Sequence, residues 1–391
     1  MIVFTYSGQG SQKPAMGLPW VDHPSWELVE EAASIAQRDV AHLLLHASAE
    51  ELQETHNAQL ATYLMSMIVL DAVERVGVDA AGHAGHSLGE FSALTASGAL
   101  DFADGVRLVV ERGEAMRQAI EDQEGSMAVV LGLKDAPVEE ACAAVDEAVW
   151  VANYNAPGQV VIAGSPSGVA AAGQEAKDRG AKRITPLAVA GAFHTPLMDG
   201  ARQRLSAAID NTEIRPPEGT VVANVDATAH QSPGTWRVLM NAQLCSPVRW
   251  HQSLATLESA GFTTFIELGP GTVLTGLVKR TIKEATRHSV NTPDHLDLLL
   301  ETLAGPQSSS SEQEGEHLYA TERLVVSPAA GVFTPVSGRE IGSPVQAGDL
   351  LGHVGQEEVR SSFAGKIQGW LAVDTERVSA SQPIAWLIVE Q

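Results

Sequence analysis

Cysteine and basic residues are scarce in this chain of 391 residues. Its two cysteines, Cys142 and Cys245, lie about a hundred positions apart, which excludes a disulfide scaffold and a cysteine-based zinc site and is typical of a reducing cytoplasm. Lys and Arg total 25 against 48 Asp and Glu, so the net charge is −23. So acidic a chain repels phosphate backbones and anionic lipid, and we expect neither nucleic acid nor a membrane surface as a partner.

Long apolar runs are also missing. None approaches the roughly 20 residues of a membrane-spanning helix, and the apolar run after Met1 lacks the basic flank of a secretory signal. We therefore expect a soluble, cytoplasmic protein. With 44% hydrophobic and 19% charged residues, the composition is that of a globular protein, and the length suggests two or three domains.

The composition changes sharply at one place. Residues 305–315 read GPQSSSSEQEG, which carries too little apolar surface to form a core, so we predict a linker over residues 303–316. Strand-like and helix-like stretches alternate before it and predict an α/β domain over residues 1–302. Short strand runs separated by Gly, Pro and Ser predict a small all-β domain over residues 317–391.

Repeated βα units at the start of the long domain favour a parallel sheet covered by helices. The apolar run at residues 2–6 predicts a buried strand, and residues 87–96 and 102–120 predict helices. A different order, β-α-β-β-α-β, follows and predicts a ferredoxin-like subdomain inserted over about residues 125–190. Its strand-like runs span residues 127–133, 151–161 and 183–189, and its helix-like runs span 138–145 and 166–179.

The sequence Gly85-His86-Ser87-Leu88-Gly89 has the GxSxG pattern of a nucleophile elbow. Two glycines let a strand turn abruptly into a helix, which exposes the serine hydroxyl and points the next backbone N–H at a developing oxyanion. A purely structural turn is the alternative for the pentapeptide alone. The strand before it and the helix after it favour a nucleophile.

A serine nucleophile needs a base, and the chain has 13 histidines. His194, in GAFHTPLM, follows a strand-like run and precedes a proline, which places it on a loop at a strand end. His42 and His46 have the spacing of helical metal ligands, but no acidic third ligand is in register. We interpret these two as surface residues and expect no metal.

Several motifs occur in one order over residues 1–290: GQGSQ, GHSLGEFSAL, ERGEAM, NAPGQVVIAG, GAFH, SPVRW and ELGPGTVLTGLVKR. Together they resemble the malonyl-CoA:acyl-carrier-protein transacylases and the acyltransferase domains of polyketide synthases. The resemblance implies a hydrolase-like parallel-sheet core and a ping-pong transfer of malonyl from malonyl-CoA to the phosphopantetheine thiol of acyl carrier protein, in fatty-acid or polyketide synthesis. Relatives usually have proline where this chain has Ser7, which we expect to alter only loop stiffness.

The resemblance assigns the chemistry to particular residues. Ser87 would attack the malonyl thioester, with His194 as general base. The backbone N–H groups of Gln9 and Leu88 would form the oxyanion hole. Gln243 would orient the histidine through its carbonyl, so that the base is steered by a neutral group.

Five further residues are implied in binding the acyl group. Arg112 would hold the malonyl carboxylate, which a planar guanidinium can bind bidentately; a surface arginine is the alternative. Phe193 would block an α-methyl branch, or serve only as a core aromatic. Met116, Asn153 and Asn155 would line the acyl or pantetheine channel, although asparagines often cap loops instead.

Lys279, Arg280 and Lys283 form a basic cluster in an acidic chain. Most such clusters are solvated faces. Carrier proteins are acidic, however, so we expect this cluster to dock one. Malonyl-CoA is then a substrate, and no cofactor is expected.

The C-terminal domain contains a weak repeat, with SPAAG at residues 327–331 and SSFAG at residues 361–365. It resembles the biotinyl/lipoyl-attachment domains, which carry their group on a lysine at a hairpin tip. Here the tip, about residues 355–358, reads GQEE, and the domain's only lysine is Lys366. We expect no biotin or lipoate and instead a docking partner for this domain.

Two other functions stay open at this point. A serine thioesterase or hydrolase would use the same elbow, but it would need an acidic third member and no arginine for a carboxylate. A scaffold that docks carboxylase components through the C-terminal domain would coexist with catalysis.

Overall fold

The computed structural model describes residues 1–189, 191–303, 322–361, 363–379 and 382–388. The chain divides into two compact units, Met1–Gln307 and Ser308–Gln391. The predicted linker, residues 303–316, lies outside the described residues except for residue 303.

A five-stranded parallel sheet, in the order β7-β2-β1-β8-β9, forms the centre of the first unit. β1 is buried, as its apolar run predicts, and the parallel α/β fold is confirmed. The carboxyl ends of parallel strands meet at one edge, so the loops after β1, β2 and β8 come together there. The strands are β1 (Ile2–Tyr6), β2 (Gly82–Gly85), β7 (Thr220–Val221), β8 (Thr264–Leu268) and β9 (Thr286–Val290).

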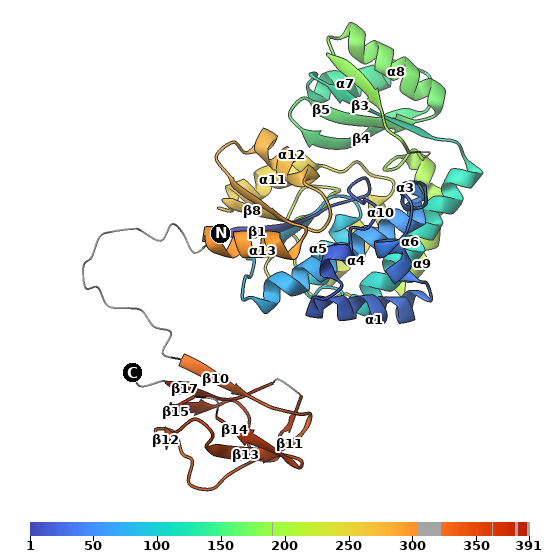
Figure 1. The fold of residues 1–391 in the computed structure, drawn as a ribbon. Coiled ribbons are helices and arrows are strands. Elements are labelled where there is room, and N and C mark those ends of the chain that lie inside the picture. The colour runs from blue at the N-terminus through green and yellow to red at the C-terminus, as the bar shows by residue number, and fades with distance from the viewer. Residues whose placement is uncertain (190, 304–321, 362, 380–381, 389–391) are drawn as a thin grey trace. The chain divides into compact units, whose positions relative to one another are not determined.

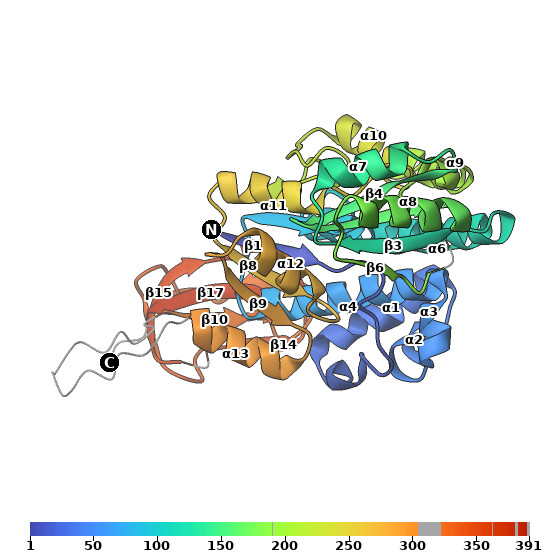
Figure 2. The same ribbon diagram turned by 90° about the horizontal axis from the view of Figure 1, so that it is seen from above.

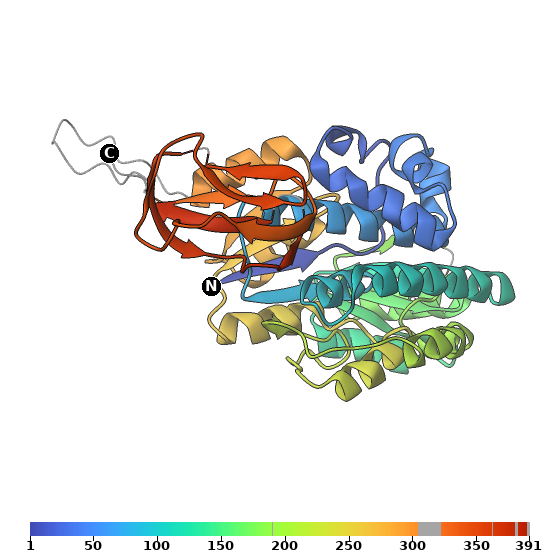
Figure 3. The same ribbon diagram turned by 90° about the horizontal axis from the view of Figure 1, so that it is seen from below.

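Helices surround this sheet. The long helix α6 lies between α1 and α9 (Figure 3) and also packs closely on α4. A Cβ atom at Gly105 would lie 2.0 Å from Tyr63 Oη, and one at Gly113 would lie 2.9 Å from His56 Cα, so only glycine permits this approach. The helices are α1 (Glu27–Ala36), α2 (Val40–Leu45), α3 (Ala49–Gln53), α4 (Thr55–Arg75), α5 (Gly89–Ala96), α6 (Phe102–Asp122), α9 (Asp199–Asp210), α10 (Pro233–Gln243), α11 (Trp250–Ser259), α12 (Val273–Thr281) and α13 (Pro293–Leu303), with 3-10 turns η1 (Leu18–Trp20), η2 (Pro24–Trp26) and η3 (Pro196–Met198).

A four-stranded antiparallel sheet, in the order β4-β5-β3-β6, makes a second layer of this unit. Its helices α7 and α8 lie side by side over the face turned away from the parallel sheet (Figures 1 and 2). The strand-like run predicted over residues 151–161 comprises two strands, as the β-α-β-β-α-β order requires: a turn at Pro157 and Gly158, where Gly158 has φ +75°, separates them. The elements are β3 (Ser126–Leu131), α7 (Asp135–Ala143), β4 (Val149–Ala156), β5 (Gln159–Gly164), α8 (Pro166–Asp178) and β6 (Arg183–Pro186).

The described part of the second unit consists of two four-stranded antiparallel sheets, ordered β10-β17-β15-β12 and β14-β13-β11-β16, as an all-β domain predicts. Phe333, Leu351 and Ile367 belong to its own hydrophobic core. The strands are β10 (Glu322–Val326), β11 (Gly331–Pro335), β12 (Pro344–Val345), β13 (Leu350–Val354), β14 (Glu357–Arg360), β15 (Gly365–Trp370), β16 (Arg377–Val378) and β17 (Pro383–Ile388).

The hairpin of β13 and β14 turns at Gly355 and Gln356. Glu357 and Glu358, predicted at the tip, begin the second strand instead. Lys366 lies in β15, where its backbone is in register with Pro344 of β12 and Ile388 of β17.

Candidate active site

Ser87 occupies a sharp turn between β2 and α5, with φ +55°. Both glycines of the GxSxG motif are needed for this geometry. A Cβ atom at Gly85 would lie 1.8 Å from the backbone of Gly89, and one at Gly89 would lie 2.0 Å from the carbonyl oxygen of Tyr6. The helix therefore begins directly against the sheet, and the serine is held in a left-handed conformation that side chains rarely adopt.

The structure brings Ser87 and His194 together from positions 107 residues apart, with Ser87 Oγ 2.7 Å from His194 Nε2. His194 Nδ1 lies 3.0 Å from the backbone oxygen of Gln243. Because a carbonyl only accepts, Nδ1 carries the proton and Nε2 is left to accept the serine hydroxyl. Burial and, to a lesser extent, the charge of nearby Arg112 lower the pKa of His194 to about 3, so the ring is a neutral base.

Arg112, on α6, is fully buried beside the nucleophile. Its Nη2 donates to Ser87 Oγ at 3.0 Å and to Gln243 Oε1 at 3.0 Å. Its Nη1 donates to Gln59 Oε1 and contacts Met116 Sδ at 3.3 Å. Burial lowers the pKa of Arg112 to about 9, which leaves the guanidinium charged at neutral pH.

The two backbone N–H groups expected to form the oxyanion hole lie in the loop after β1 and at the start of α5. Within the described residues, neither Gln9 N nor Leu88 N donates a hydrogen bond to the protein. Both donors are therefore available to an oxygen that gains charge at the reacting carbon.

A small cavity of about 100 Å³ borders the dyad. Asn155 does not line it; its Oδ1 lies 2.8 Å from Nε2 of His86, which does. The lining includes the nucleophile, the base and three of the expected acyl-binding residues: Ser87, His194, Phe193, Met116 and Asn153.

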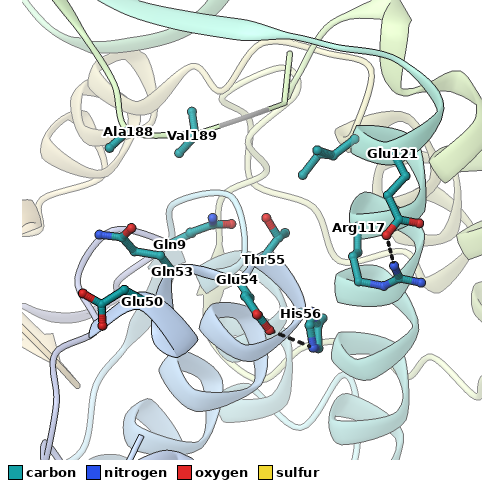
Figure 4. A pocket seen from close by; sticks show the side chains of 11 residues that line it. Gln9, Glu50, Gln53, Glu54, Thr55, His56, Arg117, Glu121, Ala188 and Val189 are labelled. Carbon is teal, nitrogen blue, oxygen red and sulfur yellow. Dashed lines mark hydrogen bonds and ion pairs between the residues drawn. The ribbon is translucent and has the colours of Figure 1, made fainter. Parts of the chain in front are cut away.

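A larger cleft of about 740 Å³ adjoins this cavity, and Gln9 and Val189 line both. Figure 4 shows Gln9 and Thr55 on one side of the cleft, facing Ala188 and Val189 on the other. The two shared lining residues place the cleft directly beside the cavity that Ser87 borders.

Three polar residues of the site were missed from the sequence: Gln59, Glu90 and Asn224. Glu90 follows the elbow in the GHSLGE motif and is 1% exposed, so an acidic residue in a buried helix turn was an available signal. Gln59 and Asn224 carried no local signal. Only the fold brings Gln59 Nε2 to 3.0 Å from Gln9 Oε1 and Asn224 Oδ1 to 2.7 Å from Ser87 N.

The basic cluster of Lys279, Arg280 and Lys283 is exposed at the end of α12. Arg280 Nη1 donates to Gln159 Oε1 of β5 at 2.6 Å, so the cluster adjoins the antiparallel sheet.

The expectation that Ser7 alters only loop stiffness stays a prediction, and the structure adds a specific contact of this side chain. Its hydroxyl donates to Glu267 Oε1 at 2.8 Å. Glu267 is a buried carboxylate at the end of β8 that also accepts from Leu274 N and Thr275 N at the start of α12. Ser7 thus ties the loop that carries Gln9 to a neighbouring helix.

His42 Nε2 lies 3.1 Å from Glu51 Oε2, and both side chains are exposed. Among the described residues, no group of three or more His, Cys, Asp or Glu side chains is arranged to hold a metal ion. No helix in the same residues has the length and apolar character to cross a membrane.

Comparison with known proteins identifies similar enzymes. The acyl transferase domain family matches residues 3–304, so the second unit, Ser308–Gln391, lies outside the match. The chain is 39% identical over 307 residues to the malonyl CoA-acyl carrier protein transacylase of Bacillus subtilis, covering 77% of this chain and 97% of the relative. It is 38% identical over 305 residues to the Escherichia coli K12 protein of that name, covering 76% and 98%.

Solved structures agree with these relatives. A type II polyketide synthase acyl-carrier protein in complex with its malonyl-transacylase matches with a TM-score of 0.74 at 36% identity, covering 77% of this chain and 99% of that one. An acyl-carrier-protein S-malonyltransferase from Burkholderia pseudomallei matches with the same TM-score at 35% identity and the same coverage.

Proposed function

The chain belongs to the acyl transferase domain family, and from that premise we propose that it transfers malonyl from malonyl-CoA to the phosphopantetheine thiol of acyl carrier protein. The choice of malonyl as the acyl group rests on one observation: Arg112 is fully buried and donates a hydrogen bond to the hydroxyl of Ser87. A fixed cation beside the nucleophile favours an acyl group that bears its own carboxylate.

Ser87 is the nucleophile and His194 the base in both half-reactions. In the first, Nε2 takes the hydroxyl proton as Oγ bonds to the thioester carbon, the C–S bond breaks, and the proton passes to the CoA sulfur. In the second, His194 takes the proton of the carrier thiol, sulfur bonds to the same carbon, and Oγ leaves with the proton. Gln9 N and Leu88 N donate to the oxyanion in each step.

Acyl selection combines charge and shape. The malonyl carboxylate replaces neutral acceptors on the Arg112 guanidinium, while Phe193 limits the space for an α-methyl branch. Met116 and Asn153 line the remaining cavity. The pantetheine arm enters through the larger cleft beside Gln9.

Lys279, Arg280 and Lys283 dock the acidic carrier protein. Complementary charge speeds association and fixes orientation more than it adds affinity. Replacing both Lys279 and Arg280 with Glu should slow transfer to the carrier about tenfold and leave loading from malonyl-CoA unchanged. The charge-matched control replaces Arg107 and Lys177, exposed residues of other helices, with Glu. An equal loss of transfer to the carrier in the two double variants would refute a local docking site.

We also propose a fold for the inserted subdomain and for the C-terminal domain, and a localisation for the enzyme. The β-α-β-β-α-β order and the sheet order of β3 to β6 support a ferredoxin-like subdomain over about residues 125–190. Two four-stranded sheets support a biotinyl/lipoyl-like domain over residues 317–391, which carries no cofactor. We place the enzyme in the cytoplasm, where its two free cysteines are stable.

Intact mass after incubation with malonyl-CoA tests the function. We expect one malonyl adduct, located on Ser87 by peptide mapping, that disappears when a pantetheine thiol is added. A thioesterase would instead release malonate without an acceptor. His194 is oriented by a backbone carbonyl in place of a carboxylate, and Arg112 is present, both of which favour the transferase. Rapid malonate release without a thiol would overturn the proposal.

A further inference from the structure

Glu90 is a buried carboxylate that the transfer mechanism does not use. It lies in the first turn of α5, three residues after Ser87, and is 1% exposed. Its Oε1 accepts from Asn224 N at 2.7 Å, and its Oε2 accepts from Gln243 Nε2. Both oxygens accept N–H groups, which is the pattern of an ionised carboxylate. Burial raises the pKa of Glu90 to about 7, against the opposing effect of these donors and of Arg112.

The two donors to Glu90 are the residues that hold the elbow and the base. Asn224 Oδ1 accepts from Ser87 N at 2.7 Å, and Asn224 Nδ2 donates to Gly85 O at 2.7 Å. Gln243 Nε2 also donates to Ser87 O at 2.9 Å, and its backbone oxygen receives His194 Nδ1. The backbone on both sides of the nucleophile and the orientation of the base therefore depend on groups fixed by Glu90.

Arg112 has no carboxylate partner among the described residues. Its terminal nitrogens contact the neutral acceptors of Gln59, Gln243 and Ser87 and the sulfur of Met116, while its Nε has no partner. A buried guanidinium without a counter-charge is costly. The negative charge of Glu90 raises the pKa of Arg112 and so favours its charged form. The amide side chain of Gln243 lies between the two groups: its Nε2 donates to Glu90, and its Oε1 accepts from Arg112.

We propose that Glu90 is a positioning residue and an indirect counter-charge for Arg112. A direct Arg–Glu pair would occupy the guanidinium with a protein carboxylate. With Gln243 between them, the cation is stabilised in the empty site, yet its donors face only neutral acceptors that the substrate carboxylate can displace. The inference rests on the proposed malonyl transfer and explains how a buried arginine is held ready for an anion.

Glu90→Gln tests this arrangement, because it keeps the size and removes the charge. Its amide nitrogen must face one of two N–H donors, so kcat should fall about tenfold for malonyl-CoA and for acetyl-CoA alike. Removing a negative charge near the substrate carboxylate should lower the KM for malonyl-CoA about threefold, while the KM for neutral acetyl-CoA stays unchanged. Glu90→Asp keeps the charge and shortens the side chain, so kcat should fall while the ratio of the two KM values stays that of the wild type.

The matched control is Glu267→Gln, which removes another buried carboxylate that accepts backbone N–H groups. It should leave the ratio of the malonyl and acetyl KM values unchanged. An unchanged ratio in Glu90→Gln would refute the counter-charge, and an altered ratio in Glu90→Asp would refute it even if the first variant failed to fold. Absence of a malonyl adduct on the wild-type chain would refute the proposed function instead, so the two failures are distinguishable.

Discussion

The turn at Ser87 and the hairpin turn at Gly355 both have a positive φ, but the residues packed around them differ. Ser87 has φ +55° and Gly355 has φ +63°. Glycine adopts this region without strain, whereas serine does so at a cost of about 1–3 kcal/mol. In the first unit the strained residue is the serine that we propose as the nucleophile. In the second unit, which we propose to be biotinyl/lipoyl-like, a glycine stands at the hairpin tip where an attachment domain would carry its lysine.

Their surroundings differ in the same way. Ser87 contacts four polar residues through its hydroxyl and backbone: His194, Arg112, Asn224 and Gln243. A Cβ atom built at Gly355 would meet no atom within 4 Å. The comparison indicates that a turn becomes a functional site through the packed polar groups around it.

Replacing Ser87 with Ala should have the largest effect, since it makes the elbow as unreactive as the hairpin. We expect malonyl transfer to fall at least about 10³-fold, with no malonyl adduct, because the nucleophile is lost while the pocket survives. The control is Ser253→Ala, which removes a buried hydroxyl that donates to the carbonyl oxygen of Arg249 at the start of α11. This variant should stay active. Retained transfer by the Ser87 variant, measured with malonyl-CoA and carrier protein, would refute the acyl-serine mechanism.

Replacing Arg112 with Ala should have the next largest effect, because the elbow keeps its nucleophile and loses its cation. A desolvated malonyl carboxylate without its partner costs about 2–5 kcal/mol, so malonyl kcat/KM should fall at least about 30-fold. Acetyl transfer should persist or increase, because acetyl carries no charge. Arg107→Ala, on an exposed face of the same helix, is the control. If malonyl and acetyl transfer fell by the same factor, Arg112 would have a structural role and would not select the acyl group.

Acid should destabilise the first unit more than the second. Burial lowers the pKa of His83 to about 4 and that of His194 to about 3, and it also lowers the pKa of His86. The unfolded chain binds these protons below about pH 6.5 and the folded chain does not, so stability falls as pH falls. Glu90 acts in the opposite direction: burial raises its pKa to about 7, so below that pH the folded chain takes up a proton that the unfolded chain binds only at lower pH.

The net loss for the first unit should be on the order of 2 kcal/mol between pH 7 and pH 5. The buried histidines named above all lie in the first unit, so we expect a smaller change in the second. Hydrogen exchange read by mass spectrometry on the full chain separates the two units. Equal changes in protection in both would contradict the assignment to buried histidines.

Local features of this fold were predictable, and long-range polar contacts were not. The first strand was predicted at its observed bounds, and the elbow between β2 and α5 followed from GxSxG, because both depend on neighbours in the sequence. The β-α-β-β-α-β order implied two strands within residues 151–161, but the position of the turn between them, at Pro157 and Gly158, was not predicted. Ser87 and His194 were paired through a family resemblance, since spacing alone cannot choose among 13 histidines. Gln59 and Asn224 reach the site only through tertiary packing.

The smallest expected effect concerns the second unit, which should remain unmodified when biotin ligase and lipoyl ligase are supplied. An attachment domain presents a lysine at a tight hairpin tip, whereas Gly355 and Gln356 form this one. Lys366 lies within β15, whose backbone pairs with strands on both sides, so its position is fixed by the sheet and differs from an exposed tip. Residues 1–303 alone should also transfer malonyl as the full chain does.

Intact mass of the chain co-expressed with the two ligases measures this directly, and Lys366→Arg is the matched control. We expect the same unmodified mass, apart from the substitution, in both. An adduct on the wild-type chain that is absent from Lys366→Arg would show that this lysine within a strand is modified. It would contradict the prediction that the second unit carries no biotin or lipoate. Gln356→Lys places a lysine at the hairpin tip itself. If a lysine at the tip still receives no group, the hairpin lacks the neighbouring contacts that a ligase needs, just as a serine without its polar neighbours would not be a nucleophile.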